Sequence, residues 1–192
     1  MNPLPPLVLA SRSPRRRMLL EQAGFDFTLL PPDEAAEDSR REGEPTADYV
    51  ARLARQKAED VAPAAPAERI VLACDTLAEC MDEILGKPRD RQHAGQMLRW
   101  MRGREHQVLS GLCLLRGADR KRAVAVDRTT LRMDEVDDEQ IEQYLDGGQW
   151  QGKAGAFGYQ DGIDWVHILE GSESNVVGLP MELLMRMLEE FA

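Results

Sequence analysis

The stretch after the apolar run 7–10 carries side chains suited to anion binding: Ser11, Ser13, Arg15 and Arg16. The apolar run predicts a buried strand, and Pro14 at a first turn predicts a helix over 14–23. At such a turn, free N–H groups and the helix dipole favour an anion, and hydroxyl and guanidinium groups add donors. The pattern indicates either a polyphosphate site or a serine-capped helix with a solvated basic face.

Local charge supports the polyphosphate interpretation. Residues 1–25 hold four arginines against one acidic residue, Glu21, whereas the whole chain has 34 acidic and 24 basic residues and a net charge of -10. The overall acidity argues against nonspecific nucleic-acid binding and against a polybasic membrane patch. No Walker A pattern occurs in the sequence, so any phosphate site must be of another type.

A carboxylate inside an apolar segment is the second chemical signal. Asp75, followed by Thr76, interrupts the expected strand 70–80, and burying an unpaired charge is costly. A divalent metal or a catalytic role would compensate this cost, and so would a salt bridge or a turn. Glu34, in the acidic segment 31–38, is a weaker candidate for the same chemistry.

Two lysines and a glycine-rich segment complete the set of candidates. Lys57 lies one turn after Leu53 on an otherwise apolar helix face, and Lys87 stands in the turn GKPRD. With the serines, arginines and carboxylates, they are the parts needed to bind a metal-polyphosphate and hydrolyse it. Gln160 lies in the segment 152–162, which is either a flexible loop or a loop that approaches a ligand and reads a base edge.

Strands and helices alternate early in the chain, and a hairpin follows. This order predicts an α/β fold with a mixed sheet flanked by helices, in one domain over 1–192. We expect a helix capped by Thr46, a helix capped by Asp90, and two long strands around the turn 117–119. The expected elements are strands at 7–10, 27–32, 70–80, 106–115 and 122–133, and helices at 14–23, 46–61, 91–101, 137–146 and 181–191.

The remaining features concern location and assembly. The three cysteines form no C-x-x-C pair and indicate neither zinc nor a disulfide framework. No apolar run reaches the length of a membrane span, and the N-terminal segment lacks the positive flank of a signal peptide, so we expect a cytoplasmic protein. The apolar face of the helix 181–191 fits a core position or a homodimer interface equally well.

Several motifs, in this order, carry a resemblance to a known family: SRSPRR (11–16), PPDE (31–34), RLARQKA (52–58), CDT (74–76), GKPRD (86–90), HQVLSG (106–111), KAGAFGYQ (153–160) and VVGLP (176–180). The chain resembles the Maf family of nucleotide pyrophosphatases over nearly its whole length. The resemblance implies a fold like that of inosine triphosphate pyrophosphatases, with a cleft between two lobes. It also implies hydrolysis of a nucleoside triphosphate to the monophosphate and pyrophosphate, with Mg²⁺ or Mn²⁺.

The resemblance also implies residue roles. Ser11, Ser13, Arg15 and Arg16 would bind phosphate, and Lys57 and Lys87 would contact the phosphates or the base. Asp75 would be the essential carboxylate, as metal ligand, general base or both, with Glu34 as its partner.

The AGAFGYQ string and Arg15 resemble the dTTP and UTP branch, in which Arg15, Lys87 and Gln160 would discriminate the base. Modified pyrimidine nucleotides would then also be substrates. Two alternatives stay open, namely the 7-methyl-GTP pyrophosphatase branch and a non-enzymatic nucleotide-binding regulator of septum formation. The two carboxylates favour an enzyme over the regulator.

Overall fold

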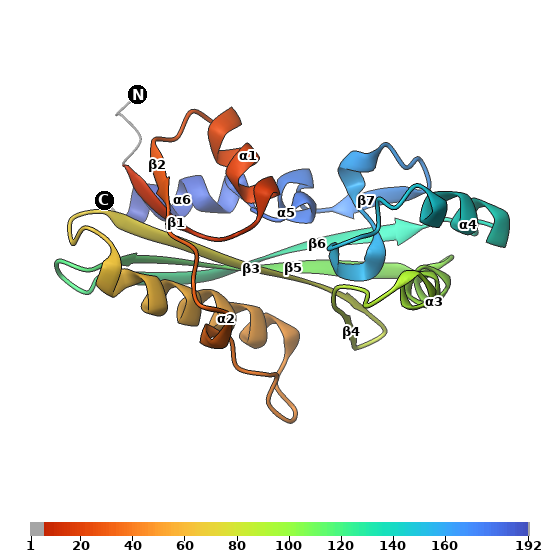
Figure 1. Ribbon diagram of the computed structural model, residues 1–192, viewed down its shortest axis with the longest axis horizontal. Coiled ribbons are helices and arrows are strands. Elements are labelled where there is room, and N and C mark those ends of the chain that lie inside the picture. The colour runs from red at the N-terminus through yellow and green to blue at the C-terminus, as the bar shows by residue number, and fades with distance from the viewer. Residues whose placement is uncertain (1–5, 192) are drawn as a thin grey trace.

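The computed structural model describes residues 6–191, apart from the side chains of Glu34 and Asp161. Within these residues one mixed sheet carries helices on both faces, as Figure 1 shows. The strands are β1 (Leu7–Ala10), β2 (Phe27–Leu29), β3 (Ile70–Cys80), β4 (Glu83–Leu85), β5 (Glu105–Arg116), β6 (Arg122–Met133) and β7 (Val166–Glu170). The helices are α1 (Pro14–Gln22), α2 (Thr46–Val61), α3 (Arg91–Met101), α4 (Asp138–Asp146), α5 (Glu173–Val177) and α6 (Met181–Phe191). Short 3₁₀ turns lie at Glu34–Ala36, Ala62–Ala64, Ala154–Ala156 and Tyr159–Asp161.

The predicted α/β class with a mixed sheet is confirmed. The strand order is β2-β1-β3-β5-β6-β7, with β4 beside β3. β1 pairs in parallel with β2 and β3, and the other pairings are antiparallel. None of the helices in the described part of the chain is long and apolar enough to cross a membrane.

Two expectations about single elements were incomplete or wrong, and one was confirmed in full. Thr46 does not cap α2, because Pro45 occupies the cap position and the Thr46 hydroxyl instead contacts the Glu79 carboxylate on β3. The strand expected at 70–80 is confirmed as β3, which runs past Asp75 and Thr76 without a break because β5 pairs with it along this length. β4, β7 and α5 were not anticipated, since each spans five residues or fewer and shows little periodicity.

The long strands β3, β5 and β6 run through two lobes, each with its own apolar packing (Figure 1). In one lobe, α1 and α6 pack on one face of the sheet and α2 packs on the other. The other lobe holds α3, α4, β4 and β7. The long strands therefore fix how the two lobes face each other.

Strand β3 has an open edge where the lobes meet. Its pairing with β1 ends at Ala10 opposite Ala73, and its pairing with β4 begins at Ala78 opposite Leu85. Residues 74–77 therefore have no strand neighbour on that side. Because side chains alternate along a strand, Asp75 points toward α2 while its neighbours point to the other face.

Candidate active site

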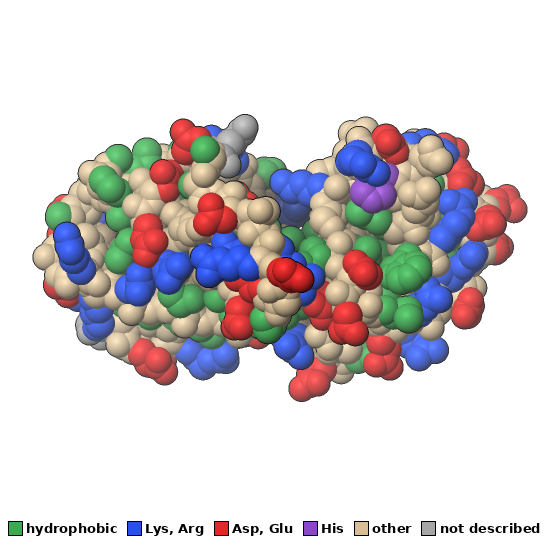
Figure 2. Space-filling model, turned by 90° about the horizontal axis from the view of Figure 1, so that it is seen from below, with side chains coloured by type: hydrophobic (Ala, Val, Ile, Leu, Met, Phe, Trp, Pro, Cys, Tyr) green, Lys and Arg blue, Asp and Glu red, His purple; other side chains and the backbone are tan. Residues whose placement is uncertain are grey.

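A cavity of about 660 Å³ lies at this open edge, between the two lobes. Figure 2 shows the molecule narrowed between the lobes, with Lys and Arg side chains gathered beside the constriction. The charged residues that line it are six cations and two acids, namely Arg12, Arg15, Arg16, Lys57, Lys87, Lys153, Glu37 and Asp75. This excess of positive charge, in a chain of net charge -10, suits a polyanionic ligand.

The structure brings most of the predicted site residues together. The residues that line this one cavity include Ser11, Ser13, Arg15, Arg16, Lys57, Asp75, Lys87 and Gln160. Glu34 lies in the 3₁₀ turn 34–36, and its side chain lies outside the described part of the structure. The cavity collects these residues from both lobes, because the strands that connect the lobes place the two halves of the site face to face.

The turn from β1 into α1 has the capping geometry that the sequence predicted. Ser13 is the N-cap residue and its hydroxyl accepts from the Arg16 N–H at 3.4 Å, while Pro14 begins the helix. The first turn of α1 holds arginines and no acidic residue, so these cations lie at the positive end of the helix dipole. Cations are unfavourable at this end of a helix, and a bound anion would offset their repulsion by the dipole. A serine cap with a solvated basic face gives no reason for arginines at these positions.

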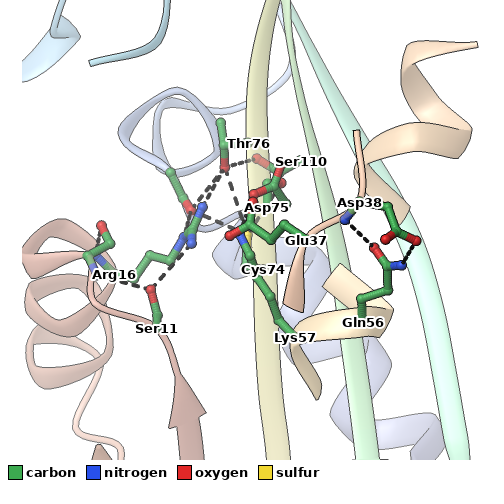
Figure 3. A network of polar contacts seen from close by, with 12 residues as sticks. Ser11, Arg16, Glu37, Asp38, Gln56, Lys57, Cys74, Asp75, Thr76 and Ser110 are labelled. Carbon is green, nitrogen blue, oxygen red and sulfur yellow. Dashed lines mark hydrogen bonds and ion pairs between the residues drawn. The ribbon is translucent and has the colours of Figure 1, made fainter. Parts of the chain in front are cut away.

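Arg16 is held by the protein itself. Its Nε donates to the Gly178 carbonyl at 2.8 Å, its Nη1 to Ser11 Oγ at 3.3 Å and its Nη2 to Thr76 Oγ1 at 3.1 Å. Thr76 Oγ1 also lies 2.8 Å from Ser110 Oγ, so the network reaches from α1 to β5 (Figure 3). The guanidinium therefore connects the serine turn to the strand segment beside Asp75.

Asp75 is nearly buried and paired with a lysine. Lys57 Nζ donates to Asp75 Oδ1 at 2.5 Å and lies 3.1 Å from Glu37 Oε1 (Figure 3). The side chains of Lys57 and Asp75 are 9% and 11% exposed, whereas that of Glu37 is 41% exposed. The salt bridge explains how a carboxylate is tolerated at this depth, because the charge of Lys57 compensates that of Asp75.

Sequence reasoning missed Glu37 and Tyr49. Glu37 lies in the same acidic segment as Glu34, and nothing in its spacing singles it out. Tyr49 lies two turns before Lys57 on α2, with Leu53 between them, and all three line the cavity. This i, i+4, i+8 spacing was the signal that could have found it.

Burial sets the protonation of two groups near the site. Burial raises the pKa of the Cys74 thiol, whose Sγ lies 3.4 Å from the Gly178 carbonyl, so the thiol has no thiolate character. Burial also raises the pKa of Tyr49, and the charge of Asp75 raises it further. Both groups are therefore neutral at physiological pH.

Two carboxylates in the wall of the cavity, those of Asp75 and Glu37, are available to a cation that also binds a ligand. Among the described residues, no group of three or more His, Cys, Asp or Glu side chains is placed to hold a metal. Asp75 and Glu37 contact Lys57 through one oxygen each. Mg²⁺ usually binds one or two carboxylates together with substrate phosphates, so this donor set fits a metal that arrives with a polyphosphate.

Comparison with known proteins gives consistent results over almost the whole chain. Residues 6–191 match the model of the family described as "Maf-like protein". A protein of Rhodopirellula baltica named dTTP/UTP pyrophosphatase is 50% identical over 186 residues, which is 96% of this chain and 82% of that protein. A protein of the same name from Ruminiclostridium cellulolyticum is 40% identical over 185 residues, covering 96% of this chain and 95% of the relative.

A solved structure supports the fold. The Ham1 protein of Staphylococcus aureus superposes with a TM-score of 0.54 at 16% identity, over 96% of this chain and 98% of that one. At this identity the similarity concerns the fold alone.

Proposed function

Because the chain belongs to the family of Maf-like proteins, we propose that its cavity binds a nucleoside triphosphate and hydrolyses it to the monophosphate and pyrophosphate. One observation carries the proposal: cations from both lobes surround a nearly buried Asp75–Lys57 pair in a single cavity. The names of the relatives support dTTP and UTP as substrates. In the reaction, the anhydride bond between the α and β phosphates is broken by water, which gives the nucleoside monophosphate and free pyrophosphate.

The residues divide between phosphate binding, the reacting centre and the base. Ser11, Ser13 and Arg15 bind phosphate oxygens at the start of α1, where the helix dipole adds to their charge. Arg16 contributes its charge there while it keeps the turn in place. From the other lobe, Lys87 and Gln160 contact the base, and the amide of Gln160 supplies the paired donor and acceptor that a pyrimidine edge requires.

Asp75, Glu37 and Lys57 form the reacting centre of this proposal. Asp75 and Glu37 hold a divalent cation, Mg²⁺ or Mn²⁺, with Glu34 as a further candidate ligand from the same acidic segment. When bound, such a cation neutralises charge on the phosphates and activates water. Lys57 keeps the Asp75 carboxylate oriented through its 2.5 Å contact and lies where negative charge develops on the phosphates.

The test compares wild-type protein with Asp75→Asn, using dTTP, UTP and 7-methyl-GTP with Mg²⁺ or Mn²⁺. Monophosphate and pyrophosphate are separated by chromatography. We expect wild-type protein to release pyrophosphate from dTTP and UTP. In the variant, kcat should fall about 1,000-fold or more, since loss of an acid–base group typically costs roughly 10²–10⁴ in rate. Hydrolysis of 7-methyl-GTP alone would overturn the base preference. Nucleotide binding without hydrolysis in the wild type would overturn the enzymatic proposal.

A further inference from the structure

Tyr49 faces the cavity from the same side of α2 as Leu53 and Lys57. At 1.5 Å per residue, Tyr49 lies about 12 Å along the helix axis from Lys57. Lys57 marks the position of Asp75, where the phosphates bind in the proposed function. Tyr49 is therefore displaced from Lys57 along the helix, although both residues border the same cavity and the charge of Asp75 still acts on the Tyr49 phenol.

The course of α2 places Tyr49 toward the second lobe. α2 runs antiparallel to β3, because Thr46 contacts Glu79 near the end of the strand while Lys57 reaches Asp75 near its middle. The loop that carries Gln160 belongs to the second lobe and lines the same cavity, and its Gly155 packs near Ala78 on the face of β3 opposite α2. Tyr49 therefore lies on the second-lobe side of Lys57, and Gln160 lines the same cavity from that lobe, where the base is expected.

The ring of Tyr49 is held in place from one side. The Arg52 guanidinium carbon lies 5.1 Å from the ring centroid, and Arg52 donates to Glu44 through Nε at 2.7 Å and Nη2 at 2.6 Å. Arg52 and the Glu44 side chain are largely buried, so this support is rigid. An aromatic ring fixed in this way can stack on a ligand at little entropic cost.

Tyr49 is also the more accessible of the two aromatic rings that line the cavity in the described residues. The other ring, Phe157, is 5% exposed and lies edge-on to His106, with ring centroids 5.4 Å apart. Tyr49 is half-buried, and its phenol keeps its proton because burial and Asp75 raise its pKa. A neutral, partly exposed ring at this end of a nucleotide cavity suits an aromatic base, because stacking requires only a π-face.

We infer that Tyr49 is a substrate-binding residue on which the pyrimidine base stacks, with the ring supported by Arg52 and Glu44. The inference rests on the proposed function, since it names the residue that receives the base in that site. Stacking acts on affinity for the nucleoside part and leaves the interactions of the phosphates unchanged. It therefore predicts a change in KM that an inhibitor without a base does not show.

The experiment compares Tyr49→Leu with Tyr49→Phe, the matched variant that keeps the ring. We expect Tyr49→Leu to raise KM for dTTP and UTP about tenfold, as for loss of one stacked base, with kcat changed far less. Inhibition by inorganic tripolyphosphate, which has no base, is expected to change less than twofold. Tyr49→Phe is expected to recover most of the lost affinity. Thermal melting of both variants verifies that they are folded.

Three results would overturn the inference. Equal loss of affinity for tripolyphosphate and dTTP in Tyr49→Leu would mean that the whole site is distorted. A fall in kcat of the same size in both variants would assign the role to the hydroxyl, and an unchanged KM in Tyr49→Leu would remove any role in binding. Calorimetric binding of dTTP keeps the test independent of hydrolysis. If the wild type bound dTTP tightly but did not hydrolyse it, the proposed reaction would be refuted. The difference in dTTP affinity between wild type and Tyr49→Leu would still measure the contribution of Tyr49.

Discussion

Lys57 Nζ lies 2.5 Å from Asp75 Oδ1, although Lys57 belongs to helix α2 and Asp75 to strand β3. Both side chains are nearly buried, so each compensates the charge of the other. The pair joins the helix to the strand at the point where the strand edge is open. It has consequences for stability as well as for activity.

Lys57→Met is expected to lower the free energy of unfolding by about 3 kcal/mol, since it leaves Asp75 without its buried partner. Activity should fall by about 100-fold or more, because the carboxylate loses its orienting contact. Denaturant unfolding and steady-state kinetics measure the two effects. Lys87→Met is the matched control for the unfolding measurement, because Lys87 is exposed in the same cavity and no ion pair to it is found among the described residues. Equal destabilisation by both variants would contradict the prediction.

Glu37→Gln is expected to lower activity about tenfold or more and to raise the Mg²⁺ or Mn²⁺ concentration needed for half-maximal rate, since one of two carboxylates at the cation site is lost. A metal titration at saturating dTTP measures this. Asp38→Asn provides the control, because its carboxylate is 65% exposed and lies by Arg52 and Gln56 instead of Lys57. The role of Glu37 is refuted if the two variants give the same metal titration.

Arg16→Lys keeps the positive charge but removes the planar guanidinium that bonds to Ser11, Thr76 and Gly178. Loss of about two net hydrogen bonds, near 1 kcal/mol each, should lower Tm by roughly 4–8 °C. kcat should fall about tenfold because the serine turn moves relative to Asp75. Calorimetry and kinetics measure the two effects. Arg17→Lys, at an exposed arginine paired with Glu21, should change neither, and an unaltered kcat in Arg16→Lys would contradict the positioning role.

Gly111→Ala is expected to destabilise the protein by about 3 kcal/mol or more, because a Cβ there would lie 2.2 Å from the Val50 carbonyl oxygen. Gly111 is opposite Asp75 on β5, and Val50 lies on α2, so the helix can only relieve this clash by moving away from the sheet. Urea unfolding measures the loss. Gly117→Ala, whose Cβ would meet its nearest atom at 3.6 Å, is expected to stay within about 0.5 kcal/mol of wild type. A stable Gly111→Ala protein would show that α2 does not pack this closely.

His106 predicts a pH dependence of stability. The side chain is buried, and burial lowers the pKa of His106 from 6.5 to about 4 against a smaller, opposing effect of the Arg104 backbone. The unfolded chain binds a proton below pH 6.5 that the folded protein binds only near pH 4. Stability contributed by the neutral ring is therefore complete above pH 6.5 and is lost as the pH falls, by about 3 kcal/mol in total.

His106→Leu removes the titrating imidazole and places an apolar side chain at the same position. We expect the free energy of unfolding to fall less steeply between pH 6.5 and 4 in this variant than in wild type, by a difference of about 3 kcal/mol. Urea unfolding at a series of pH values measures both curves. Parallel curves would mean that His106 titrates normally in the folded protein.

The amino-acid sequence alone predicted the fold class, and most of the site residues that it predicted line the cavity. Alternating apolar segments predicted most of the long strands and helices, because burial of apolar residues at a fixed period is a local property. The serine and arginine turn, the Gly-Lys turn at Lys87 and the glycine-rich loop at Gln160 were visible as candidates because their residue types are unusual in their local context. The short elements β4, β7 and α5 were not visible, since they owe their conformation to their neighbours.

Which of these candidates contact one another could be seen only once the chain was folded. No spacing in the sequence relates Lys57 to Asp75, and the choice of Glu37 as the carboxylate beside Lys57 depends on how the acidic segment crosses α2. The sequence predicted Arg16 as a phosphate ligand, and the tertiary structure adds that its guanidinium also bonds to Ser11, Thr76 and Gly178. Such contacts join residues that are distant in sequence. Their geometry follows from the close packing of α2 on Gly111 and from the open edge of β3. Neither feature is encoded by a local sequence pattern.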